Sequence, residues 1–141
     1  MYTVKRMQEA SRRGDTRGVA YYTSRSSETE KSQAAVLAAR HGHREIVLYL
    51  VSLGIPNIDE IFHEAAEFNR VNILQDLITE VSRATIARSM VDAAKYGNVG
   101  AVLFLEAYDP QAAREALREA WRNEQWYVVG ELRRLGYRMS E

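Results

Sequence analysis

The stretch AVLAARHGHREIVLYLV, residues 35–51, decides the fold because it contains two apolar stripes on either side of Gly42. Each stripe has the three- and four-residue spacing that places side chains on one face of an α-helix. The stripes consist of Ala35, Ala38 and Ala39, and of Ile46, Val47 and Leu50. Glycine between two such stripes favours a tight turn, because it adopts the left-handed conformation that ends many helices. The stretch therefore predicts a helix, a tight turn and a second helix.

The same pattern occurs five times along the chain, in segments that begin at Met7, Ala35, Phe62, Met90 and Leu117. Three residues after each start stands an alanine, and successive alanines are separated by 28, 27, 28 and 27 residues. These alanines are Ala10, Ala38, Ala65, Ala93 and Ala120. The turn position, seven residues after each start, holds Gly14, Gly42, Asn69, Gly97 and Glu124. A fixed period of this length is typical of stacked repeat units.

The repeats predict an all-α fold of ten helices in five pairs, with at most vestigial strand. A single domain is expected over residues 1–141, with units at 4–25, 32–54, 59–81, 86–108 and 110–136. One helix pair cannot bury its apolar side alone, so neighbouring pairs stack and the small alanines let helices approach closely. Ala34 lies off these rows and is expected to tolerate a larger residue better.

Two connectors between the predicted helices give further predictions. The stretch 24–32 is the most polar connector and is expected to be a mobile loop. Asp109 and Pro110 have the residue types of a helix N-cap and first turn, and they predict a helix that runs toward Arg122.

Residues 38–54, AARHGHREIVLYLVSLG, resemble the ankyrin repeat through their paired alanines, Gly-His turn, Glu-Ile-Val and final Leu-Gly. Residues 93–98, AAKYGN, are a looser match. The resemblance implies an ankyrin-like α-solenoid. The Thr-Pro-Leu-His opening of the family is absent, and the period is shorter than the usual 33 residues. The β-hairpins of the family are therefore expected to be reduced or absent, as in shortened arrays that look like those of some large DNA viruses and intracellular bacteria.

The resemblance also implies a non-catalytic protein–protein interaction module, because ankyrin-type arrays commonly bind partners on the concave face, near the C-terminal ends of the inner helices. The corresponding positions in this chain are Arg12, Arg13, Arg40, His41, Glu67, Phe68, Lys95, Tyr96, Arg122 and Asn123. Basic residues predominate and two aromatic residues lie in the middle, which predicts a partner protein with an acidic surface. Acidic residues one helical turn earlier are expected to neutralise this ladder partly, through the pairs Glu9–Arg12, Asp92–Lys95 and Glu119–Arg122.

The alternative interpretation is a nucleic-acid or other polyanion binder that uses the basic side chains of the same ladder. The 141 residues include 19 basic and 19 acidic ones, and a net charge of zero argues against a general nucleic-acid-binding protein. The 46% hydrophobic content excludes general disorder, and the lack of cysteine excludes disulfides and thiolate metal sites. No signal peptide or membrane-length apolar run is evident, which predicts a cytoplasmic protein of the producing or host cell without a membrane partner.

The chain has three histidines, His41, His43 and His63, which could be imagined as a metal site. His43 stands in the Gly-His position of the ankyrin pattern, where the resemblance implies a structural hydrogen-bonding role. The segment from His63 to Glu67 is similar to a zinc-protease helix, but Glu67 stands where that motif requires its second histidine. No glycine-rich phosphate loop and no hydrolase nucleophile motif occur. The sequence therefore predicts no enzyme, no catalytic residue, no metal and no cofactor.

The last unit differs from the others at the position that follows the repeat alanine. This position holds Ser11, Ala39, Ala66, Ala94 and Trp121. Trp121, Trp126 and Tyr127 are interpreted as a cap on the open end of the array, with a dimer or partner interface as the alternative. The sequence leaves the oligomeric state open.

Overall fold

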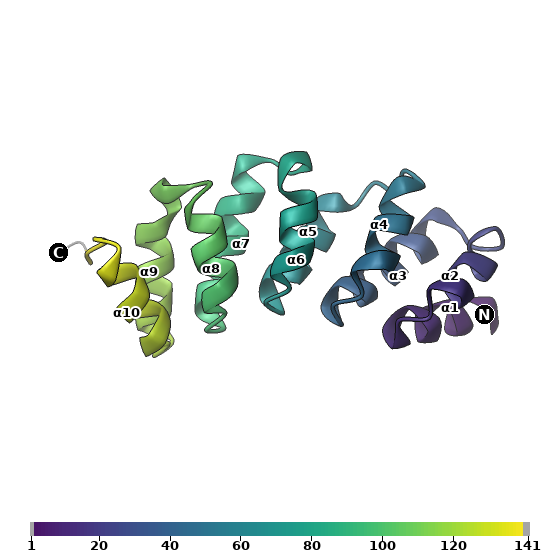
Figure 1. The fold of residues 1–141 in the computed structure, drawn as a ribbon, viewed down its shortest axis with the longest axis horizontal. Helices are drawn as coiled ribbons and strands as arrows, with labels where there is room; N and C mark the ends of the chain where they lie inside the picture. The colour runs from purple at the N-terminus through teal and green to yellow at the C-terminus, as the bar shows by residue number, and fades with distance from the viewer. Residues whose placement is uncertain (1, 140–141) are drawn as a thin grey trace.

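The structure, a computed structural model, describes residues 2–139, and these fold into ten α-helices with no strand (Figure 1). The helices are α1 (Tyr2–Arg13), α2 (Thr16–Thr23), α3 (Glu28–Arg40), α4 (Arg44–Ser52), α5 (Ile58–Glu67), α6 (Val71–Leu77), α7 (Arg83–Lys95), α8 (Val99–Glu106), α9 (Ala113–Arg122) and α10 (Trp126–Arg134). Two short 3₁₀ turns, η1 (Ile78–Glu80) and η2 (Pro110–Ala112), follow α6 and precede α9. The all-α prediction with ten helices is confirmed. Within residues 2–139 no helix has the length and apolar character needed to cross a membrane.

The helices pack as pairs that follow one another in a single row. Each odd-numbered helix contacts the even-numbered helix after it and the odd-numbered helices of the neighbouring pairs. The even-numbered helices contact one another in the same order, so the row has two layers. Figure 1 shows the row bent into a shallow arch, with the N- and C-terminal pairs at opposite ends. The tight turns within pairs lie along the concave edge and the connectors between pairs along the other.

The apolar positions predicted from the repeats form one continuous core between the two layers. All five repeat alanines are buried, and so are the paired apolar residues of the even-numbered helices from Ile46 and Val47 to Val128 and Val129. Small side chains at the alanine positions allow the odd-numbered helices to stack closely. Ala34, which lies off the repeat rows, is also fully buried, and this argues against its expected greater tolerance of a larger residue. It belongs to the same helix face as Ala38, one turn earlier on α3.

Two predicted boundaries need correction. Helix α3 begins at Glu28 because the Ser27 hydroxyl accepts a hydrogen bond from the Glu30 amide at 3.1 Å, so residues 28–32 are helical rather than a loop. Asp109 and Pro110 take the predicted N-cap and first-turn positions, but in a 3₁₀ turn, and the buried Asp109 carboxylate makes no cap hydrogen bond and lies 3.6 Å from the guanidinium of Arg83 on α7. The chain after it forms the turn η2, and α9 starts only at Ala113.

The five predicted turn positions all adopt the left-handed backbone conformation. Their φ angles are 81° at Gly14, 78° at Gly42, 60° at Asn69, 77° at Gly97 and 59° at Glu124. Glu124 therefore makes the same turn as the glycines, although a side chain with a Cβ carries a conformational cost there. The turn geometry is thus fixed by the repeat, and the residue type only changes its energy.

A row of side-chain donors just after these turns joins each unit to the one before it. Each donor binds a backbone carbonyl at the C-terminal end of the preceding odd-numbered helix, where intrahelical partners are lacking. The bonds run from His43 to Arg12 at 2.6 Å, from Arg70 to Arg40 at 3.0 Å, from Asn98 to Ala66 at 3.0 Å, and from Gln125 to Lys95 at 3.0 Å. In the first unit, which has no helix pair before it in the structure, the equivalent Asp15 accepts from the Gly18 amide of its own helix at 2.9 Å.

Gly97 serves both this donor row and the left-handed turn. A Cβ at Gly97 would lie 2.4 Å from the amide oxygen of Gln125, whereas a Cβ at Gly54, with φ of +85°, would meet nothing within 4 Å. We expect Gly97→Ala to lower the free energy of unfolding by about 1 kcal/mol more than Gly54→Ala, because it also displaces the Gln125 hydrogen bond. Urea unfolding of the two variants measures the difference. Equal losses would mean that the Gln125 bond contributes nothing.

The C-terminal tail is tied back to the array by Tyr137. Its hydroxyl donates to Glu106 Oε2 on α8 at 2.6 Å. Burial, this hydrogen bond and the negative charge of Glu106 raise the pKa of Tyr137 to about 12. The folded state therefore favours the protonated phenol.

A phenol pKa above its unfolded value of about 10 gives a stabilisation that is complete below pH 10 and is lost as the pH rises toward 12. We expect the difference in unfolding free energy between the wild type and Tyr137→Phe to shrink across this window. Chemical denaturation at several pH values up to 11.5 provides the test. If the difference in unfolding free energy between the two proteins does not change with pH, the Tyr137 hydroxyl makes no hydrogen bond that is specific to the folded state.

Candidate functional site

The ten residues predicted from the repeats lie where the odd-numbered helices end, along the edge that carries the tight turns. Each unit contributes either the last two residues of its helix or the last residue and the residue that caps it. We call this set the inner strip: Arg12, Arg13, Arg40, His41, Glu67, Phe68, Lys95, Tyr96, Arg122 and Asn123. Most of these side chains are exposed, and Arg40, Glu67 and Asn123 are half-buried.

The centre of the inner strip is a hollow of about 470 Å³ lined by Glu67, Phe68, Tyr96 and Asn98. Phe68 is 44% exposed and Tyr96 is 52% exposed. The Arg40 guanidinium lies 5.5 Å from the centroid of the Phe68 ring, within the range of cation–π attraction. The Asn98 amide is held by its hydrogen bond to the Ala66 carbonyl. The hollow thus has two exposed rings on a fixed backbone.

Most cations of the inner strip have carboxylate partners. Arg12 pairs with Glu9, and Arg122 lies 3.4 Å from Glu119, as the sequence predicted. Arg40 pairs with Glu64 of the next unit at 2.7 Å, a contact that the spacing within one helix does not reveal. These exposed pairs add little stability. They do lower the positive charge that the strip presents.

The predicted pair between Asp92 and Lys95 does not form. The Asp92 carboxylate lies 2.9 Å from His63 Nε2 on the neighbouring helix α5. Lys95 instead lies over the ring of Tyr96, 5.6 Å from its centroid. His63 from the adjacent helix has therefore replaced Lys95 as the partner of Asp92.

His63 links α5 to α7 through two side chains. Its Nε2 faces Asp92, and its Nδ1 lies 3.3 Å from the hydroxyl of Ser89. The order serine, histidine, aspartate matches that of a hydrolase triad, but Ser89 is fully buried and cannot reach a substrate. Within residues 2–139 no cluster of three or more histidine and carboxylate side chains has the arrangement of a metal site. We interpret the cluster as a structural link between two units.

His41 has a lowered pKa, which reduces the positive charge that it adds to the strip. Desolvation lowers the pKa of His41, and the nearby His43 and the guanidinium groups of Arg40, Arg12 and Arg70 lower it further. Its ring stacks on His43 with 6.3 Å between the ring centroids. The ladder is therefore less basic than the sequence suggested.

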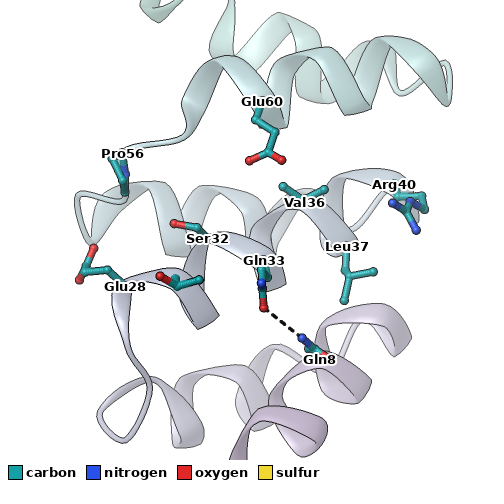
Figure 2. A pocket seen from close by; sticks show the side chains of 10 residues that line it. Gln8, Glu28, Ser32, Gln33, Val36, Leu37, Arg40, Pro56 and Glu60 are labelled. Carbon is teal, nitrogen blue, oxygen red and sulfur yellow. Dashed lines mark hydrogen bonds between the residues drawn. The ribbon is translucent and has the colours of Figure 1, made fainter.

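Two grooves extend from the inner strip along the odd-numbered helices, and neither was predicted. The first, of about 660 Å³, lies over α3 between α1 and α5 and ends at Arg40 (Figure 2). Figure 2 shows Leu37 and Val36 directed to opposite sides of α3, and the hydrogen bond between Gln8 and Gln33 that crosses from α1 to α3. The second, of about 590 Å³, lies between α5 and α7, and its lining is acidic apart from Arg88, His63 and Thr85. Each groove is formed by helices of different repeat units, so no local sequence motif predicts it.

Comparisons with known proteins assign no family: no protein-family model matches the chain, and no curated protein is significantly similar to it.

Proposed function

We propose that this protein is an ankyrin-like α-solenoid that binds another protein through the inner strip and performs no chemistry of its own. The observation that carries the proposal is the central hollow with its two exposed rings, Phe68 and Tyr96. Interfaces are enriched in aromatic residues at their energetic centres. Adjacent exposed rings do not stabilise the folded chain as buried rings would. Their exposure therefore favours a role in binding.

The solenoid part of the proposal is supported by the packing pattern. Each helix pair contacts its neighbours in the row, the unit length is 27–28 residues, and short turns stand where the ankyrin family has β-hairpins. The Asn98 and Gln125 bonds between units repeat the same register along the row. An array of this kind offers a long, continuous edge to a partner.

The inner strip is suited to binding because little has to be ordered when a partner arrives. Phe68 and Tyr96 occupy the cap positions of α5 and α7, where the following turn fixes their backbone. Arg40 is already held by Glu64 and lies over Phe68. Rings with two side-chain torsions lose little entropy when they are covered. The binding energy is therefore expected to come mainly from these two rings.

The polyanion alternative is the weaker of the two functions. Arg12, Arg40 and Arg122 already have carboxylate partners, and phosphate would have to displace them. The groove between α5 and α7 adds further carboxylates beside Glu67. A polyanion binder would show a steep fall in affinity with salt, since phosphate contacts release counterions. We expect only a shallow salt dependence.

Site-specific photocrosslinking tests the proposal directly. A benzoylphenylalanine at position 96 is compared with one at Tyr108, which is equally exposed but lies in the connector between α8 and η2. In cells that produce the protein, position 96 is expected to give a discrete protein adduct that position 108 lacks. Identical adducts from both positions, or a nucleic-acid adduct from position 96, would contradict the proposal.

A further inference from the structure

The C-terminal end of the array exposes a group of apolar side chains. Trp121 is 44% exposed, Trp126 is 53% exposed and Tyr127 is 72% exposed, and Leu135 and Met139 are exposed beside them. Trp121 and Trp126 pack edge to face, with 5.2 Å between their ring centroids. The two tryptophans pack against each other, and all three aromatic side chains remain exposed. The aromatic group leaves a large apolar area open to solvent.

This end face continues the packing interface that joins the units. In the other four units the residue equivalent to Trp121 is fully buried by the next odd-numbered helix; these residues are Ser11, Ala39, Ala66 and Ala94. Within residues 2–139 no helix follows α10, the partner of α9 in the last pair. A surface that is covered at every other junction is therefore uncovered here, and it carries large side chains instead of small ones.

A cleft of about 550 Å³ in this end face is lined by Trp121, Arg133, Arg138 and Met139. Arg138 donates to the carbonyls of Arg133 at 3.1 Å and Tyr137 at 2.9 Å, which holds its guanidinium in place. Within residues 2–139 neither Arg133 nor Arg138 has a carboxylate partner. The neighbouring Arg134, by contrast, pairs with Glu131 at 2.6 Å. The cleft therefore combines apolar walls with two uncompensated positive charges.

We propose that this end face binds an acidic segment of another protein, with an apolar side chain against Trp121 and Met139 and a carboxylate at Arg133 and Arg138. Charge complementarity selects this occupant. A second copy related by a two-fold axis would bring the same arginines together. A copy stacked head to tail would present the N-terminal pair, whose exposed side chains include Arg13 and Arg17. The cleft shares no lining residue with the central hollow of the inner strip.

The test uses a displayed library of random peptides panned on the full chain. Selected peptides are titrated by intrinsic tryptophan fluorescence, which reports on this site because both tryptophans of the chain lie here. The double variant Arg133→Glu with Arg138→Glu probes the cleft. Arg17→Glu on α2 together with Arg25→Glu in the connector after it is the matched control, because these two arginines are exposed like Arg133 and Arg138.

We expect the wild type to select peptides with acidic residues next to an apolar one, and these to perturb the fluorescence. Reversal of both cleft charges is expected to weaken their binding roughly tenfold or more, while the control pair and the double variant Phe68→Ala with Tyr96→Ala retain it. The proposal is overturned if the peptides carry no acidic bias or if charge reversal leaves their affinity unchanged. It is also overturned if light scattering shows a wild-type dimer that Trp121→Ala dissociates, because a second copy would then be the occupant.

Discussion

Leucine in place of Ala65 or Ala93 is expected to lower the free energy of unfolding by roughly 1–3 kcal/mol or more. Both alanines are fully buried where α5 and α7 stack against their neighbours. Three additional carbon atoms have no space there, so the helices must separate or the side chain must adopt a strained rotamer. Urea denaturation followed by circular dichroism measures the loss. Because neighbouring units depend on each other, the unfolding transition is also expected to become less cooperative.

Ala84 provides the matched control on one of the same helices. It lies on α7 but is exposed, so Ala84→Leu is expected to change the unfolding free energy by less than about 0.5 kcal/mol. Ala34 is fully buried and is expected to behave like Ala65, contrary to the prediction from its position off the repeat rows. If leucine at Ala65, Ala93 and Ala84 gave equal denaturation midpoints, the register of the stacked helices would be wrong.

The sequence predicted the helices and turns well because both depend on local signals. Apolar spacing identifies a helix face, and Gly42 or Gly97 identifies the turn that follows it. The donors that join the units were not predicted, apart from a structural role for His43. The reason is that His43, Arg70 and Asn98 differ in size and charge, and share only their polarity and a hydrogen-bond donor. Periodicity analysis finds apolar stripes and does not separate such a row from the other polar positions.

The places of the inner-strip residues at the helix ends were also predicted, but only part of their ion pairing was. Spacing within a helix suggested that Asp92 would pair with Lys95, whereas the stacked neighbour brings His63 closer to Asp92. Arg40 likewise pairs with Glu64 of another unit. Residues 24 to 32 apart in sequence become neighbours only after stacking. The register of one helix against the next therefore sets the electrostatics of the inner strip.

Phe68→Ala and Tyr96→Ala are expected to weaken partner binding by about 1–3 kcal/mol each, the range of interface hot spots. Each substitution removes an exposed ring from the central hollow, so the free energy of unfolding is expected to change little. Arg40→Ala is expected to act mainly on the association rate and its salt dependence, because it removes a positive charge and leaves its partner Glu64 uncompensated. Calorimetric titration with the crosslinked partner, once it is identified, gives the affinities.

Tyr108→Ala is the control for these variants, since it removes an equally exposed ring from the connector after α8. Its partner affinity is expected to equal that of the wild type. The two hollow variants are close enough to couple, so their double variant is expected to lose less than the sum of the single losses if one partner side chain contacts both rings. Full affinity in Phe68→Ala and Tyr96→Ala together with a loss in Tyr108→Ala would place the partner on the opposite edge of the array, and the inner strip would then have no role in binding.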